Sequence, residues 1–218
     1  MSDLAIATYC PRKLHYARED DRKPPPIVEK RRELAFAYPE LLAGTDDELS
    51  ARAIAVSPES YRNNLEASRA RLDVWDAIVD PEERDAFLTG RECRGIVQKV
   101  LTPENRTPMP SLVFAGSPPE AGVWKPQAVR AVGAAKALAW EREVSVEAAI
   151  VEYPAHGVIR RLPLTTRRLA AYRKAIRTIE SMDGVPPRIR NRSKCSPCQY
   201  RETCGVRTRS LRSLLRLG

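Results

Sequence analysis

Four cysteines near the two ends of the chain have the residue type and spacing of a metal site. Three of them form the motif Cys195-Ser196-Pro197-Cys198 followed by Cys204, and the fourth, Cys10, lies close to the N-terminus. A Cys-x2-Cys spacing lets two thiolates bind one metal from a tight turn. Four thiolates satisfy either a tetrahedral zinc ion or a 4Fe–4S cluster, and the spacing alone leaves both open. Either site would join the start of the chain to its end.

The composition of the chain indicates what class of protein carries these cysteines. The 218 residues, 43% of them hydrophobic, fit one domain with a sizeable core. The first residues lack a basic segment ahead of an apolar stretch, and no segment approaches the roughly 20 apolar residues of a membrane span. We therefore expect a cytoplasmic protein with no membrane partner, in which clustered cysteines bind metal more often than they form disulfides. Cys93 stands alone and is predicted to be a small, partly buried side chain.

Positive charge is concentrated in the last part of the chain. Residues 153–218 hold 16 Lys and Arg against three acidic residues, whereas residues 1–152 hold 21 against 25. Most of the basic residues near the C-terminus are arginines, whose planar guanidinium suits phosphate. This charge favours a polyanion such as DNA, and the alternative is a solvated tail. The residues predicted to contact nucleic acid are Arg188, Arg190, Arg192, Lys194, Arg201, Arg207 and Arg209.

The elements that must position these residues follow from periodicity and from proline and glycine. Helical spacing predicts a short helix before Pro11, helices over 27–35 and 59–75, and a helical turn from Pro81. Runs rich in β-branched residues predict strands over 95–101, 110–116, 146–153 and 157–164. Helices are predicted over 125–142 and from Thr165 or Thr166 to Glu180. This order predicts an α/β fold, with helices packed on a central mixed sheet.

Two segments carry a resemblance to a known family. Tyr9-Cys10-Pro11-Arg12-Lys13-Leu14, together with Lys194-Cys195-x2-Cys198-x-Tyr200-x3-Cys204, resembles the iron–sulfur RecB-type nucleases of the PD-(D/E)-x-K superfamily. The CRISPR-associated exonucleases are the most similar members, and the resemblance runs in order along the whole chain. It implies one RecB-like nuclease domain over 1–218, in which residues 1–26 and 185–218 form the cluster region and 205–218 a basic tail. It also implies a 4Fe–4S cluster, with zinc as the runner-up, on Cys10, Cys195, Cys198 and Cys204.

The catalytic pattern of that family is missing from this chain. The family places an Asp on one strand, Glu-x-Lys on the next and Gln-x3-Tyr on the following helix, and its carboxylates hold Mg²⁺ or Mn²⁺. Here Gln98 stands at the Asp position, residues 111–116 carry no charge, and the helix offers Val132 and Lys136. An amide and an apolar strand cannot replace two carboxylates, so no catalytic residue is assigned.

These observations predict a catalytically degenerate family member that binds DNA, expected to be single-stranded, or a nucleic-acid-processing protein. One alternative is an active Mg²⁺- or Mn²⁺-dependent single-strand DNA exonuclease, with Glu104 or Glu120 as a relocated ligand. A second alternative is a zinc-stapled interaction module. Among the aromatic residues, Tyr200 is the best candidate to stack on a base or to pack on the cluster. The three tryptophans are predicted to anchor the core: Trp75, Trp124 and Trp140.

Overall fold

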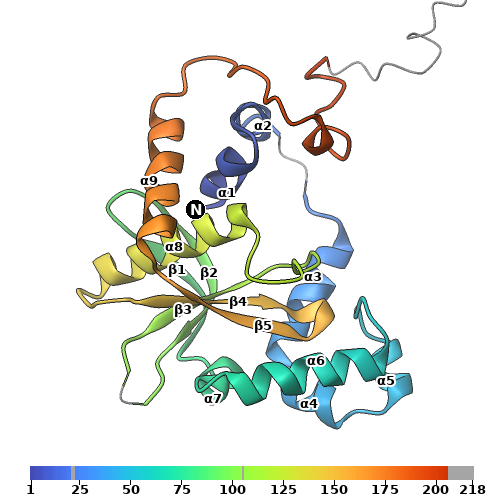
Figure 1. Ribbon diagram of the computed structural model, residues 1–218. Coiled ribbons are helices and arrows are strands. Elements are labelled where there is room, and N and C mark those ends of the chain that lie inside the picture. The colour runs from blue at the N-terminus through green and yellow to red at the C-terminus, as the bar shows by residue number, and fades with distance from the viewer. Residues whose placement is uncertain (21–22, 105, 206–218) are drawn as a thin grey trace, which may run out of the picture.

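A computed structural model describes residues 1–20, 23–104 and 106–205 of the chain (Figure 1). The helices of this part are α1 (Ser2–Tyr9), α2 (Pro11–Ala17), α3 (Pro26–Glu33), η1 (Leu34–Phe36), α4 (Tyr38–Ala43), α5 (Asp46–Ser50), α6 (Pro58–Arg71), α7 (Trp75–Val79), α8 (Lys125–Glu141), η2 (Pro154–His156), α9 (Thr166–Glu180) and η3 (Arg192–Lys194). The strands are β1 (Glu83–Thr89), β2 (Arg94–Leu101), β3 (Met109–Val113), β4 (Ala148–Tyr153) and β5 (Val158–Pro163).

The five strands form one mixed sheet in the order β1-β2-β3-β4-β5. Strands β1, β2 and β3 are antiparallel neighbours, α8 then crosses over, and β4 runs parallel to β3. β5 returns antiparallel to β4. Because helices flank this sheet, the predicted α/β class is confirmed (Figure 1).

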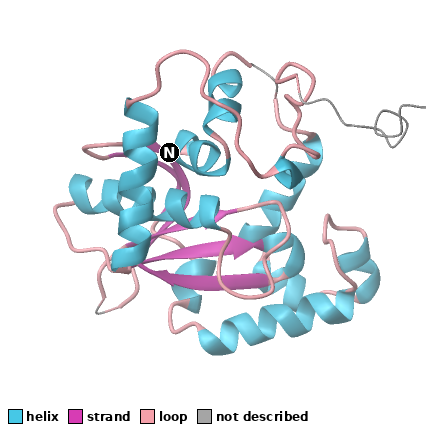
Figure 2. Cartoon of the chain, turned by 45° about the horizontal axis from the view of Figure 1, so that its top comes forward, coloured by secondary structure: helices cyan, strands magenta, loops and turns pink. Residues whose placement is uncertain are grey.

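Helices cover both faces of the sheet. Alanines of α8 pack with Val97, Leu112 and Val151 on one face. Leu4 of α1 and Tyr172 of α9 form an adjoining cluster with the same helix. On the opposite face, residues from the helices between 34 and 79 pack against β3 and β4, and Figure 2 shows these helices grouped at one side of the strands. The N-terminal and C-terminal segments therefore share the α8 side of the molecule.

The predicted order of strands and helices from residue 94 onward is confirmed, but the segment at Pro81 is not a helical turn. It leads directly into β1, whose burial alternates only at Ala86 and Leu88. β1 lies at the edge of the sheet, where charged residues discourage pairing with other chains, and that charge hid the strand. The helix predicted over 59–75 ends at Arg71, and a separate helix, α7, begins at Trp75.

Two of the three tryptophans do not anchor the core as predicted. Trp124 is 51% exposed and Trp140 is 58% exposed, whereas Trp75 stacks on the buried Tyr38. Trp124 comes just before α8. Trp140 lies in the last turn of α8, whose Ala137 and Leu138 pack on the sheet, but its own side chain is exposed on another side of the helix. Within the described part of the chain, no helix has the length and apolarity needed to cross a membrane.

Candidate metal centre

The two ends of the described chain meet beside α1 and α2, as the cysteine positions led us to expect. The Tyr9 hydroxyl donates to the Lys194 carbonyl at 2.9 Å, and the Lys194 Nζ donates back to the Tyr9 carbonyl at 3.1 Å. Arg12 donates to the carbonyl of Pro186 at 3.1 Å. In Figure 1 the blue α1–α2 segment lies beside the orange-to-red segment that follows α9.

Local backbone structure presents each cysteine. Cys10 is the extended residue between α1 and α2, and Pro11 fixes the first position of the second helix. Cys195 ends η3, and the Cys198 N–H donates to the Cys195 carbonyl at 3.1 Å. The Cys204 N–H donates to the Tyr200 carbonyl at 2.8 Å. Successive tight turns thus bring the three late cysteines into one short stretch of chain.

All four thiols line one small cavity. Every one of these cysteines is half-buried and unbonded to another cysteine. The cavity is lined by Cys10, Cys195, Cys198 and Cys204 together with Tyr9, Arg12, Lys13, Tyr16, Ile189, Lys194, Tyr200 and Arg201. The donor set is therefore purely thiolate and closed off by aromatic and cationic side chains, which is the ligand chemistry of iron–sulfur and structural zinc sites.

The four cysteines line this cavity, but among the described residues no three cysteine, histidine, aspartate or glutamate side chains form a group that could hold a metal ion. Four thiolates as a ligand type suit a zinc ion and a 4Fe–4S cluster alike.

Cations surround this cavity. Burial alone would lower the pKa of the Arg12 guanidinium, but its hydrogen bond to Tyr16 and the neighbouring Cys204 raise it. The Lys194 ammonium lies 4.9 Å from the centroid of the Tyr9 ring, and that of Lys13 lies 5.4 Å from it. These groups would neutralise the negative charge of a centre bound by four thiolates.

Tyr200 packs at this site instead of offering a free ring for base stacking. It is 5% exposed, its hydroxyl donates to Asp20 at 2.6 Å, and its ring lies 5.8 Å from that of Tyr16. Gln199 also donates to Asp20, at 3.3 Å. Of the two roles expected for Tyr200, this geometry favours packing.

The predicted nucleic-acid contacts fall into three groups. Three of them are exposed on the segment between α9 and the cysteine turns: Arg188, Arg190 and Arg192. Lys194 and Arg201 are half-buried and line the thiol cavity. Arg207 and Arg209, with the rest of the predicted tail from 206 to 218, lie outside the described residues.

Gln98 lies where β2 and β3 diverge. The paired residues of β2 run from Lys99, opposite Ser111, to Leu101. Gln98 comes immediately before the first of these pairs. Its side-chain carbonyl instead accepts from the Val113 N–H at 3.0 Å, and the side chain is 4% exposed. Gln98 thus joins the strands through its amide. Glu104 and Glu120, the proposed relocated ligands, are solvent-exposed loop residues.

A buried ionic network under this point was missed by sequence reasoning. The Lys99 Nζ donates to Glu152 at 3.0 Å and to the carbonyls of Ala35 and Ile78 at 2.6 and 2.9 Å. Glu152 also accepts from Tyr38 at 2.8 Å and from Ser111 at 2.5 Å. Lys99 and Glu152 are both 0% exposed, so neither side chain is in contact with solvent. The sequence signal for this network was a single charged residue in each of two apolar strands, Lys99 in one and Glu152 in the other. Charged side chains that are buried usually lie next to an opposite charge.

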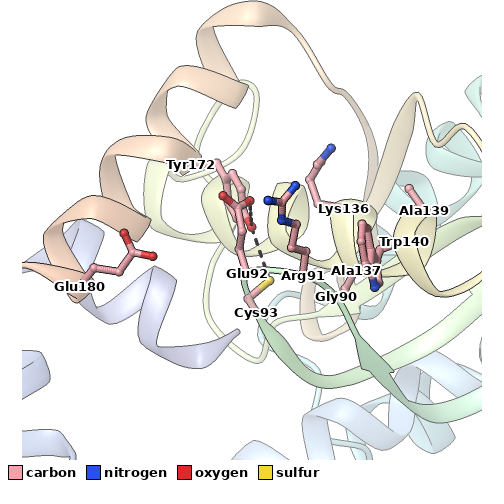
Figure 3. Close-up of a pocket in the computed structure, with 10 residues that line it drawn as sticks. All are labelled: Gly90, Arg91, Glu92, Cys93, Lys136, Ala137, Ala139, Trp140, Tyr172 and Glu180. Atoms are coloured by element: carbon pink, nitrogen blue, oxygen red, sulfur yellow. Dashed lines mark hydrogen bonds between the residues drawn. The ribbon is translucent and has the colours of Figure 1, made fainter.

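Cys93 lies in a separate open pocket, shown in Figure 3, between the β1–β2 turn, α8 and α9. Its thiol donates to the Gly133 carbonyl at 3.4 Å and accepts from the Tyr172 hydroxyl at 3.7 Å. Burial raises the pKa of this thiol, although the Tyr172 hydrogen bond opposes the effect. The prediction that Cys93 is a small, partly buried side chain is confirmed.

Comparisons with protein families and curated proteins found no match. No protein-family model matches the chain, and no curated protein matches it.

Proposed function

We propose that this chain is an iron–sulfur protein with a RecB-like nuclease fold that binds single-stranded DNA without cutting it. The observation that carries the proposal is the shared cavity of Cys10, Cys195, Cys198 and Cys204. These thiols come from opposite ends of the chain, and they match the cysteine pattern of that family in order. The 4Fe–4S cluster would be a structural staple, because its binding free energy is available only to the folded chain.

The order of the core elements supports the family assignment. The family carries its catalytic groups on two successive strands and the helix after them, and β2, β3 and α8 follow one another in that order. Absence of cleavage follows from the residues at those positions. The side-chain carbonyl of Gln98 accepts a hydrogen bond from the Val113 N–H, and the β3 residues Leu112 and Val113 carry no charge. Two carboxylates, which Mg²⁺ or Mn²⁺ would need, are missing at this point.

DNA is the proposed partner because the segment beside the thiol cavity is exposed and basic. Arg188, Arg190 and Arg192 extend from it, and acidic residues are scarce in this part of the chain. The staple would hold these guanidinium groups in a fixed arrangement instead of on a free tail. A phosphate backbone bound in this way releases counterions, so its affinity falls steeply with salt.

Anaerobic purification followed by iron, sulfide and zinc analysis tests the cluster. The wild-type protein should be coloured, with iron and sulfide in 4Fe–4S proportion. Cys10→Ser should lose both, whereas Cys93→Ser, which removes a thiol outside the cavity, should keep them. A colourless preparation containing zinc alone would contradict the cluster and favour the zinc-stapled module.

Fluorescence anisotropy with a labelled single strand at several salt concentrations tests the partner. We expect binding that weakens linearly in log–log form, with a slope of roughly −0.7 for each neutralised phosphate. The same strand incubated with Mn²⁺ should stay intact. Digestion would overturn the claim that the protein does not cut, and binding indifferent to salt would overturn the proposed contact.

A further inference from the structure

Three arginines, Arg31, Arg32 and Arg130, lie near the residues that flank the paired part of β2 and β3. Arg31 of α3 donates to the carbonyl of Ala115, just after β3, at 3.0 Å. Arg130 of α8 lies over the ring of Phe114, with 5.6 Å from its Cζ to the ring centroid. Its Nη2 reaches the Ile96 carbonyl at 3.5 Å, a long contact. Arg31 and Arg130, from two different helices, thus reach the consecutive residues Ala115 and Phe114.

Two of these guanidinium groups lack a counter-charge. Arg32 pairs with Glu29 at 3.1 Å and with Asp85 at 3.4 Å. Arg31 and Arg130, in contrast, form no ion pair with any described carboxylate. The Nε of each is buried without a hydrogen-bond partner. A guanidinium offers five N–H donors, so much of the donor capacity of both groups is unused.

The electrostatic environment of Arg130 agrees with its lack of a counter-charge. Burial lowers the pKa of Arg130, and the nearby positive charge of Arg32 lowers it further. Uncompensated burial of a charge costs free energy, and folds keep such costly groups mainly at functional sites. A phosphate oxyanion is the ligand that would satisfy them, since guanidinium groups bind its oxygens with paired, charge-assisted hydrogen bonds.

We propose that Arg31 and Arg130 form an oxyanion site that holds a backbone phosphate of single-stranded DNA without a metal ion. The identity of the ligand rests on the proposed function, whereas the oxyanion site rests on the arginines alone. The surface next to the site suits a nucleotide. Ile96 and its cross-strand partner Phe87 are 48% and 58% exposed, and an exposed aromatic ring can stack on a base.

Thermal unfolding with inorganic pyrophosphate, in buffer containing EDTA, tests the oxyanion site. Ligand that binds only the folded state raises Tm, so we expect a concentration-dependent rise for the wild type. The rise should be lost in Arg130→Met and in Arg31→Gln. It should persist in Arg71→Gln, which removes the same charge from an exposed position on α6. Equal rises in all four proteins would overturn the site, because they would reflect a general salt effect.

Single-strand DNA binding then separates the site from the wider function. Arg130→Met and Arg31→Gln should each weaken binding about tenfold or more, and the salt dependence should lose roughly one phosphate contact. Arg71→Gln should bind like the wild type. If the wild type binds DNA and both variants bind equally well, the oxyanion site is wrong and the proposed function stands. If pyrophosphate binding needs the arginines but DNA is not bound, the proposed function is wrong and the oxyanion site stands.

Discussion

At the residue scale, the most demanding feature is the ion pair between Lys99 and Glu152. Both charges are fully buried, yet every hydrogen bond they need is supplied by Tyr38, Ser111 and two backbone carbonyls. Burial lowers the pKa of Lys99, and Glu152 opposes that shift. A buried ion pair need not stabilise the fold more than two apolar side chains would, but each charge offsets the free-energy cost of burying the other.

Removing one partner should therefore be costly. We expect Lys99→Met to lower the free energy of unfolding by about 3–5 kcal/mol, because Glu152 would keep a buried charge with no counter-ion. The double variant Lys99→Met with Glu152→Gln should recover a large part of this loss. Urea unfolding followed by circular dichroism measures both. A loss below about 1 kcal/mol in the single variant would show that the pair is not needed.

His156 offers a second test at this scale, through pH. Its Nε2 is buried without a partner, and burial, then the charge of Arg31, lowers its pKa. The unfolded chain therefore binds a proton near pH 6.5 while the folded chain does not, so stability falls as the pH drops through that value.

We expect His156→Gln to lose this part of the pH dependence between about pH 7.5 and 5.5. Urea unfolding at several pH values gives the comparison with the wild type. His15 is the only other histidine in the sequence and remains in both proteins. Parallel curves for the two proteins would contradict the assignment.

At the scale of elements, the turn between β4 and β5 is held against α6 by close backbone contact. Gly157 adopts φ = 64°, and a Cβ at this position would lie 2.6 Å from the Tyr61 carbonyl oxygen. Gly184, after α9, has almost the same φ of 62° but open space around it. The two glycines thus separate backbone strain from steric clash.

Gly157→Ala should destabilise the protein more than Gly184→Ala. Both substitutions carry the left-handed cost of about 1–2 kcal/mol. Only Gly157→Ala must also displace backbone, for typically another 1–3 kcal/mol. Thermal unfolding of the two variants measures the difference. Equal Tm values would mean that α6 and the β4–β5 turn adapt freely to each other.

The strands also show which parts of the fold could be predicted from the sequence. Apolar runs bounded by glycine and proline located β2, β3 and β4, because most of their residues are buried. β5 was located by its run between Gly157 and Leu164, although only Ile159 and Leu162 of it are buried. β1 escaped because an edge strand is specified by its neighbour more than by its own residues. The Cys-x2-Cys turn was predictable from local spacing. The approach of Arg31 and Arg130 to consecutive residues just after β3 was not, because it depends on how two helices distant in sequence pack around the sheet.

At the scale of the whole molecule, the thiol cavity fastens a segment with little regular structure onto a folded core. Between α9 and residue 205, only η3 is regular among the described residues. In contrast, α1 packs through Leu4 against Val132 and Tyr172. The core should therefore outlast the loss of the proposed metal centre, whereas the segment from 185 to 205 should not.

If the proposed centre is present, its chelation or oxidation should make this segment sensitive to trypsin first. We expect early cleavage near Arg188, Arg190 and Arg192, with a resistant fragment that contains the sheet. Mass spectrometry of a limited digestion, compared with untreated protein, locates the cuts. Unchanged cleavage rates at these arginines would contradict a stapling role.

The reciprocal hydrogen bonds between Tyr9 and Lys194 also have a mechanical consequence. If the chain were pulled from handles at residues 23 and 205, tension would pass through the cysteine cavity and largely bypass the five strands. The sheet would bear load only after the cavity had opened. The first rupture in a stretching experiment would then measure the strength of the proposed sulfur-bound centre, and the wild type should resist more force there than Cys10→Ser.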